Sequence, residues 1–210
     1  MHRPLAYVAL SASLLTASAA VAGPGASSVD PAKMPAGRYV LDRTHAALTA
    51  KVKHMGFSNY TLRFTKLDAE YRYDPAQPAA AKLTVTVDPA SLDTATGADA
   101  FGLKFDKELT GDGWLEAAKY PVIRFVSTAV DVGDGQHGAV TGDLTLHGVT
   151  KPVVLDVTFN GVGSGMIPLT TRAGFSAVTT IKRSDFGVDK YVPLIGDEVT
   201  LNVEVEFEKK

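Results

Sequence analysis

Strict alternation of apolar and polar residues is the feature of this sequence that most limits its fold. The segment 198–208, EVTLNVEVEFE, alternates over its whole length. Its apolar members are Val199, Leu201, Val203, Val205 and Phe207. Because successive side chains of a β-strand point to opposite faces, this pattern predicts a strand with one buried and one solvated face.

The same alternation recurs along the chain in the segments 81–87, 123–125, 140–146, 153–159 and 173–181. With 38–54 taken as one or two strands, we count about eight strands. One-sided alternation favours antiparallel pairing, and an even run of such strands indicates a closed barrel or a sandwich. We therefore predict an all-β fold of about eight antiparallel strands with a short helical insert.

The segment 61–73, TLRFTKLDAEYRY, changes the parity of its apolar residues. Leu62 and Phe64 fall on even positions, whereas Leu67 and the apolar residues after it fall on odd ones. A slip of one residue would turn one of these sets outward. We predict a β-bulge near Thr65–Lys66 that bends the strand.

The helical insert is predicted between residues 96 and 121. Phe101, Phe105 and Leu109 are spaced at i, i+4 and i+8, which is a helical stripe. Thr96 with Asp99 forms a capping pair at its start, and Gly111 marks its end. The segment 111–121 adds a short turn, so the insert is long enough to lie across a barrel end.

The first 36 residues differ from the rest. Residues 1–22 combine Arg3, an uncharged apolar run and Ala20-x-Ala22, which predicts a cleaved signal peptide. The alternative is a membrane anchor, but the run is shorter than the ~20 residues that a spanning helix needs. Residues 23–36 are small, polar and proline-rich, so we expect a flexible leader before a single domain at 37–210.

Composition excludes several kinds of site. The chain has no cysteine, so it forms no disulfide and no thiolate nucleophile or metal ligand. Its formal net charge is −2, without an Arg/Lys cluster that would indicate nucleic-acid binding. An exported, cysteine-free domain fits the bacterial periplasm, and we predict that location.

The histidines and hydroxyls form no recognisable catalytic or metal pattern. No H-x-H or H-E-x-x-H spacing occurs among His45, His54 and His147, and no G-x-S-x-G elbow is present. His137 lies in a glycine-rich turn, and Ser184–Asp185 is interpreted as a turn. His147 is interpreted as a hydrogen-bonding turn residue between two strands. We predict no metal, no covalently bound cofactor and no enzymatic activity.

Small residues at inward positions raise the question of a hollow core. They are Ala46, Ala50, Gly142, Ala173 and Ala177. An eight-stranded barrel can fill its interior or hold one small ligand. Small side chains leave space unless neighbouring aromatic rings fill it, and the pattern alone leaves both alternatives open.

Six ordered blocks carry a family resemblance. YVLDRTHAALTAKVKHMGFS, VDPASLDT, WLEAAKYPVIRF, VTGDLTLHGVTKPVVLDVTF, IKRSDFGV and IGDEVTLNVEVE resemble blocks of the YceI-like family over about residues 37–208. The chain departs from that family at Ala46, where serine often follows the histidine. It also departs in Phe57–Tyr60, which lacks the usual glycine. Both departures would alter the mouth of the barrel rather than its interior.

The resemblance implies an exported, lipocalin-like antiparallel barrel that binds a polyisoprenoid lipid, a prenyl pyrophosphate or a prenylated quinone, in an apolar tunnel. His54, Arg183 and Lys190 are candidates for holding the headgroup, and a surface cation is the alternative for Arg183. The expected partners are the isoprenoid lipid and, transiently, a membrane surface or membrane protein. The sequence leaves the oligomeric state open, a homodimer included. The expected ligand-binding residues are Ala50, His54, Phe57, Phe64, Leu83, Phe105, Trp114, Phe125, Leu144, Phe175, Ile181, Arg183 and Phe186.

Two other functions stay open at this point. One is an enzyme acting on such a lipid, for which the sequence supplies no arranged base and nucleophile. The other is a stress-related interaction protein whose barrel is solid and holds no lipid. Tight packing of Ala46, Ala50, Ala173 and Ala177 against large side chains would favour the solid barrel.

Overall fold

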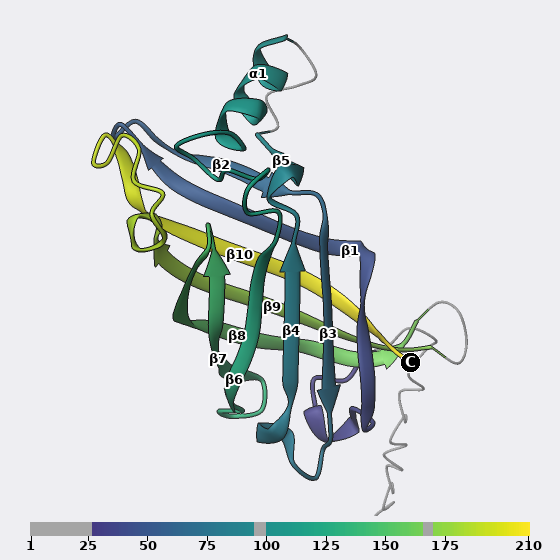
Figure 1. Ribbon diagram of the computed structural model, residues 1–210. Coiled ribbons are helices and arrows are strands. Elements are labelled where there is room, and N and C mark those ends of the chain that lie inside the picture. The colour runs from purple at the N-terminus through teal and green to yellow at the C-terminus, as the bar shows by residue number, and fades with distance from the viewer. Residues whose placement is uncertain (1–26, 95–99, 166–169) are drawn as a thin grey trace, which may run out of the picture.

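Antiparallel strands account for most of the computed structural model, which describes residues 27–94, 100–165 and 170–210 (Figure 1). The strands are β1 (Gly37–His54), β2 (Ser58–Phe64), β3 (Leu67–Tyr73), β4 (Lys82–Val87), β5 (Leu92–Asp93), β6 (Ile123–Asp131), β7 (His137–Leu146), β8 (Val149–Ser164), β9 (Thr171–Lys182) and β10 (Ile195–Lys209). One α-helix, α1 (Ala100–Leu109), and four short 3-10 helices complete the described fold: η1 (Pro31–Lys33), η2 (Pro78–Ala80), η3 (Pro89–Ser91) and η4 (Arg183–Phe186).

The sheet closes on itself through β1. The hydrogen-bonded order runs β10-β9-β8-β7-β6-β4-β3-β1, and β1 pairs again with β10. Tyr39 of β1 stands opposite Lys209 of β10 on one side and Tyr71 of β3 on the other. Within the described residues eight strands therefore form a closed antiparallel barrel, and β2 and β5 extend from β1. This confirms the predicted fold class.

The residues that alternate between apolar and polar in the sequence alternate between the inner and the outer face of the barrel wall. Val153, Leu155, Val157 and Phe159 of β8 all face the interior, and Val154 between them is 49% exposed. Residues of β4 and β10 follow the same rule. Burial of these apolar side chains, worth about 25 cal/mol per Å² removed from water, is the main stabilising contribution to such a barrel.

The chain breaks between β2 and β3 at Thr65–Lys66, the place where the sequence predicts a bulge. Phe64 ends β2 opposite Leu48, and β3 resumes at Leu67 with Ala69 and Tyr71 buried. Ser91 supplies the hydrogen bonds that the break leaves open. Its carbonyl accepts from Thr65 N at 3.1 Å, and its Oγ accepts from Lys66 N at 3.0 Å. The position of the predicted irregularity is right, but the structure has a break between two strands there and not a bulge within one strand. The break lets Phe64 pack in the cluster beneath α1 and lets Ala69 and Tyr71 face the barrel interior.

The helical insert stands at one end of the barrel, beyond β2 and β5 (Figure 1). Leu109 is buried against Phe64, and Phe105 packs on the same cluster. Gly111 follows the last turn and donates its N–H to Glu108 O. The proposed caps Thr96 and Asp99 lie outside the described residues. Within the described residues, no helix has the length and hydropathy that a membrane span requires.

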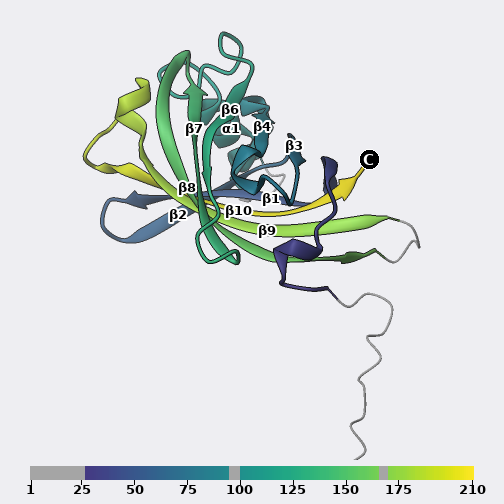
Figure 2. The ribbon, with the colours of Figure 1, turned by 90° about the horizontal axis from the view of Figure 1, so that it is seen from below.

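The described part of the expected leader, residues 27–36, lies against the opposite end of the barrel (Figure 2). Ser28 forms an isolated β-bridge with Val162. Met34 is 3% exposed within the core, and Tyr73 Oη donates to Pro31 O at 3.2 Å. The composition indicated a loose segment, but a single apolar anchor and exposed backbone carbonyls are enough to hold it in place. The proposed signal peptide lies outside the described residues.

Candidate ligand-binding cavity

The barrel encloses a cavity of about 320 Å³. Residues from β1, β3, β4, β6, β7, β8, β9 and β10 form its wall. Most are aliphatic or aromatic, and Thr179 is one of few hydroxyl groups on it. The volume lies at the lower end of the ~300–1,000 Å³ of typical ligand pockets. An apolar tail is the kind of group that such a lining accommodates.

Four of the thirteen expected ligand-binding residues line the cavity. Leu83 projects from β4, Phe125 from β6, Leu144 from β7 and Phe175 from β9. Phe175 lies edge-on to the ring of Tyr71, with centroids 5.7 Å apart. The structure thus brings these four together from strands that are far apart in sequence.

Five others pack close to the cavity without lining it. Phe64 and Phe105 belong to the cluster beneath α1, and Ile181 and Phe186 belong to the cluster at the same end of the barrel. Ala50 is buried on β1 opposite Leu201 of β10. These residues close the inner end of the cavity, because they fill the space between its wall and the capping segments.

His54 and Phe57 lie at the β1–β2 hairpin and not at the cavity. His54 is half-buried, with its ring 6.3 Å from that of Tyr60. Phe57 is 85% exposed at the tip of the hairpin. The hairpin extends β1 beyond the barrel wall, which separates both residues from the interior.

Arg183 is buried, and its guanidinium organises the chain between η4 and β10. It donates to the carbonyl oxygens of Val188, Lys190, Ile195 and Gly196 at 2.8–3.0 Å. Its Cζ also lies 5.7 Å from the ring of Trp114. Both sequence interpretations of Arg183, as a headgroup ligand and as a surface cation, are therefore wrong. The side chain bonds to backbone carbonyl oxygens, and no sequence pattern predicts such partners.

Lys190 and Trp114 lie in the same region. Lys190 Nζ is 5.4 Å from the centroid of the Trp114 ring and 3.8 Å from Glu108 Oε1. Neither residue lines the cavity. The sequence analysis gave three candidates for holding the lipid headgroup. None of them lines the cavity in this structure: they are His54, Arg183 and Lys190.

His147 occupies the turn between β7 and β8. Its φ of 52° and that of Gly148, 75°, place both residues in the left-handed region that a two-residue hairpin turn requires. Its Nδ1 lies 3.1 Å from Phe186 O, and its ring contacts Tyr120 edge-on at 4.5 Å. A Cβ at Gly148 would stand 2.6 Å from the Tyr120 ring. The interpretation of His147 as a hydrogen-bonding turn residue is confirmed.

The small inward residues divide between the two alternatives. Ala177 lines the cavity. At Gly142 a Cβ would lie 2.4 Å from Phe125 Cζ, so an aromatic ring already fills that space. Ala173 is 1% exposed within the core. Of these expected small residues, Ala177 lines the cavity, and other small residues such as Ala69 and Gly138 line it as well.

Sequence reasoning missed the residues at one end of the cavity. They are Pro31, Met34, Tyr71, Tyr73, Pro78, Asp131, Val132, Gly135 and Gln136. The odd parity of Tyr71 and Tyr73 already indicated that they face inward. The others belong to turns and to the N-terminal segment, where no periodic pattern indicates which way a residue points.

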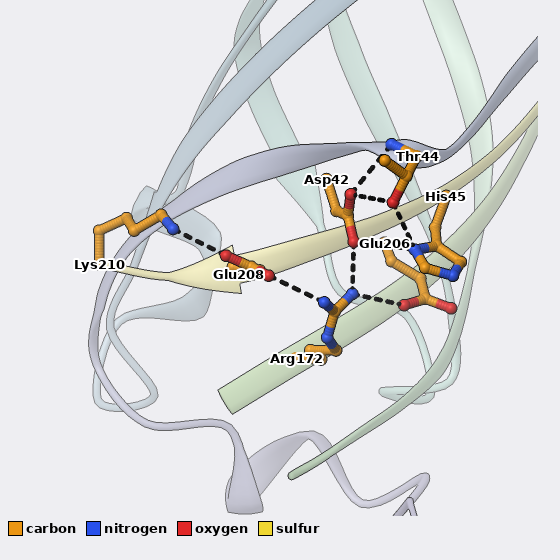
Figure 3. A network of polar contacts seen from close by, with 7 residues as sticks. All are labelled: Asp42, Thr44, His45, Arg172, Glu206, Glu208 and Lys210. Atoms are coloured by element: carbon orange, nitrogen blue, oxygen red, sulfur yellow. Dashed lines mark hydrogen bonds and ion pairs between the residues drawn. The ribbon is translucent and has the colours of Figure 1, made fainter. Parts of the chain in front are cut away.

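A polar network covers the outside of the wall where β1 bends (Figure 3). Arg172 Nη1 donates to Asp42 Oδ2 at 2.6 Å and to Glu206 Oε2 at 3.1 Å, and its Nη2 donates to Glu208 Oε1 at 2.8 Å. His45 Nδ1 lies 2.8 Å from Asp42 Oδ2. The network ties β9 and β10 to β1 across the point where the β1–β10 register shifts.

Three members of this network could in principle ligate a cation, since ligand atoms of Asp42, His45 and Glu206 lie within 4.8 Å of one another. The guanidinium of Arg172 already neutralises the carboxylates of Asp42 and Glu206, as a bound cation would. We therefore interpret the group as a structural ion-pair network.

The network makes the free energy of unfolding depend on pH in the acidic range. Hydrogen bonds from Thr44 and Arg172 hold the pKa of Asp42 well below its usual range. The network's contribution is therefore present above the unfolded-state pKa of about 3.9 and declines as the pH falls below it. We expect the wild-type free energy of unfolding to fall between pH 5 and pH 3 more steeply than that of Asp42→Asn, measured by urea titration. Asp156→Asn, on the outer face of β8, is the control, and a wild-type slope equal to that of Asp42→Asn would contradict the assignment.

A closed antiparallel barrel around an apolar cavity defines a lipocalin-like class of fold. The chain belongs to the YceI-like family, because the model of the YceI-like domain matches residues 39–207. The resemblance seen in the sequence blocks is thereby confirmed.

Relatives and solved structures agree with that assignment. A UPF0312 protein of Pseudomonas savastanoi pv. phaseolicola is 36% identical over 210 residues, covering 99% of this chain and 97% of the relative. The Campylobacter jejuni YceI protein superposes with a TM-score of 0.65 at 34% identity, over 75% of this chain and 90% of that one. A polyisoprenoid-binding domain from Saccharophagus degradans, 18% identical, has a TM-score of 0.59 over 82% of this chain and 98% of that one, and shows the shared fold.

Proposed function

We propose that this protein binds an isoprenoid lipid inside its barrel and carries it through the periplasm. The observation that supports this most is the apolar cavity of about 320 Å³, lined by residues of all eight strands of the barrel. A prenyl tail is a flexible apolar chain without strong directional chemistry. Its burial gains roughly 25 cal/mol for each Å² removed from water, which such a wall supplies.

The name of the Saccharophagus degradans domain, which shares this fold, describes it as polyisoprenoid-binding. That property is part of the proposal for this chain, together with the prenyl nature of its ligand. Carriage also implies transient contact with a membrane surface or a membrane protein, because the lipid must be taken up and released there.

The cavity favours binding over the solid-barrel alternative. A solid barrel requires large side chains over Ala177, and this residue instead faces open volume. We also favour binding over catalysis, because a ligand in this cavity would meet mostly alkyl and aryl groups, which supply no general base or nucleophile.

Extraction tests the proposal. The protein is expressed with its full sequence, purified without detergent, extracted with organic solvent and analysed by mass spectrometry. We expect a co-purifying prenyl lipid, or stoichiometric uptake of one that is added to the delipidated protein. Repeated failure of both would refute the proposal.

A further inference from the structure

We propose that a surface patch formed by two neighbouring turns docks this protein on the interface of an anionic phospholipid membrane. The inference rests on the proposed function, because carriage requires contact with a membrane, and it adds the face that makes this contact. We call this face the apolar patch, and it consists of Met55, Phe57, Tyr191, Val192 and Leu194.

The apolar patch collects half of the exposed large hydrophobic side chains. Among the described residues ten such side chains are exposed, and five of them lie in the two short segments 55–57 and 191–194. Phe57 is 85% exposed and Leu194 is 63% exposed. Single exposed apolar residues are ordinary on a protein surface, whereas a contiguous group of them marks an interaction site.

The two segments lie side by side although they are far apart in the sequence. Met55 of the β1–β2 hairpin donates its N–H to Leu194 O at 2.9 Å, and His54 pairs with Ile195 of β10. Figures 1 and 2 both show the hairpin and the loop before β10 at one corner of the molecule. The five exposed side chains therefore belong to one surface.

The backbone of both turns holds apolar side chains outward. Met55 and Tyr191 have φ angles of 50° and 64°, in the left-handed region where glycine and asparagine are the usual residues. Arg183 donates to the carbonyl oxygens of Lys190 and Ile195, which lie on either side of the exposed loop. Apolar residues at exposed, left-handed positions stabilise neither the backbone nor the core, so their placement points to a contact outside the molecule.

The charges of the two segments favour an anionic surface. The segments 51–59 and 190–196 carry Lys51, Lys53 and Lys190 and contain no aspartate or glutamate. Lys51 and Lys53 are exposed, and within the described part of the chain neither forms an ion pair. Both ammonium groups are therefore available to lipid phosphates.

The acidic residues that border these segments stand near cations of their own. Asp197 also accepts from Ser184 N at 2.9 Å and from its Oγ at 2.8 Å. The neighbouring cation is Arg183 for Asp189 and Asp197, Lys190 for Glu108, and Lys182 for Glu198. The excess positive charge beside the apolar patch thus comes from Lys51 and Lys53.

Exposed apolar and aromatic side chains next to lysines are typical of segments that enter a membrane interface. Such side chains are buried about 5–10 Å into the boundary between headgroups and acyl chains, and the lysines attract anionic lipids. Tyrosine is enriched at this depth, because its ring is apolar and its hydroxyl is polar. The apolar patch combines these features.

A second copy of this chain fits the apolar patch less well. A stable interface between two proteins usually takes about 20–30 residues from each partner, and the patch has five large apolar residues. A two-fold axis through the patch would also bring the same lysines of both copies toward each other. Size and charge therefore favour the membrane as the occupant.

The apolar patch adjoins the insert that closes one end of the cavity. The ring of Tyr191 lies 6.1 Å from that of Trp114. Trp114 packs on the cluster beneath α1, whose members Val87 and Ile123 also line the cavity. Docking through the patch therefore brings this end of the barrel to the bilayer, rather than the end that carries the N-terminal segment.

Vesicle flotation tests the inference. The protein is expressed with its full sequence, purified without detergent and mixed with vesicles of phosphatidylethanolamine and phosphatidylglycerol, or of phosphatidylcholine alone, at low and at high salt. We expect tighter binding to the phosphatidylglycerol vesicles, with a smaller difference at high salt because salt screens the lysines. The N-terminal residues are the same in every variant, so differences between variants come from the substituted side chains.

A double variant tests the apolar side chains. Phe57→Ser combined with Leu194→Ser should weaken vesicle binding at least about tenfold, and both positions are exposed, so the fold should be kept. Val154→Ser combined with Val178→Ser is the matched control. It removes two exposed valines from the outer face of β8 and β9 and should leave vesicle binding unchanged.

A second double variant tests the charges. Lys51→Gln combined with Lys53→Gln should weaken binding to the phosphatidylglycerol vesicles and reduce its dependence on salt. Arg72→Gln combined with Lys82→Gln changes the net charge by the same amount at two exposed positions of β3 and β4. This control should bind as the wild type does.

The outcomes separate this inference from the proposed function. Wild-type protein that binds neither kind of vesicle, or a Phe57→Ser/Leu194→Ser variant that binds as well as the wild type, would overturn the inference. A wild-type dimer that this variant converts to a monomer, measured by light scattering, would also overturn it, because the patch would then join two copies. In each case a co-purifying prenyl lipid would leave the proposed function standing. Patch-dependent vesicle binding by a protein that takes up no prenyl lipid would count against the proposed function and support the docking surface.

Discussion

Ala177→Trp should weaken lipid binding at least about tenfold while the barrel remains folded. Ala177 lies on β9 between Val157 of β8 and Val203 of β10, and all three line the cavity. An indole ring at this position projects into the open volume of about 320 Å³ that the tail would occupy. We expect the affinity for a prenyl ligand to fall by at least about tenfold, since that is the effect of losing ~1.4 kcal/mol of binding free energy.

Val178→Trp is the matched control for this variant. Val178 is the next residue of the same strand, points outward and is 43% exposed. The same ring introduced there should leave lipid affinity unchanged. Overpacking a filled core costs typically about 1–3 kcal/mol, so a normal thermal midpoint for Ala177→Trp would show that the ring entered open space. Unchanged affinity in a folded Ala177→Trp protein would contradict a binding site in the cavity.

Arg183→Met should destabilise the fold more than any of the other substitutions proposed for this protein. The substitution removes the N–H groups that donate to four backbone carbonyl oxygens, those of Val188, Lys190, Ile195 and Gly196. Arg183 is 6% exposed, so water can replace these donors only if the segment opens. We expect the free energy of unfolding to fall by about 3 kcal/mol or more, measured by chemical denaturation.

Two further variants define what Arg183 does. Arg183→Lys keeps a positive charge but lacks the planar fork that reaches four oxygens, so it should restore only a small part of the loss. Lys182→Met removes the exposed neighbouring cation and should have little effect. If Arg183→Lys were as stable as the wild type, positive charge rather than the set of carbonyl contacts would explain the stabilising role of Arg183, and our interpretation would be wrong.

The barrel could be predicted from the sequence because its determinants are periodic. The residues from Val153 to Phe159 alternate in the chain as they do in the wall, since strand geometry imposes a period of two. The break at Thr65–Lys66 was predictable for the same reason, because a change of parity must be absorbed somewhere between Phe64 and Leu67.

The site was less predictable, because its determinants are not periodic. Four of the thirteen expected residues line the cavity, and they are strand residues whose parity was clear. Arg183 bonds to backbone carbonyls, which every residue possesses, so its partners leave no mark in the sequence. The end of the cavity away from α1 includes residues of the turn between β6 and β7, such as Val132 and Gln136, whose direction depends on how the strands close. Met34 shows the same limit, since one apolar residue in a polar segment forms no pattern.

Contacts between the lipid tail and the wall test the central claim most directly. The protein is labelled with ¹³C on its leucine and valine methyl groups and saturated with an unlabelled prenyl lipid, and isotope-filtered NOEs are recorded. We predict NOEs from tail protons to Leu155 and Val157, which line the cavity, and none to Val154 and Val178, which are 49% and 43% exposed on the outer face of β8 and β9. NOEs to Val154 or Val178 without contacts to Leu155 and Val157 would place the lipid outside the barrel and contradict the proposal.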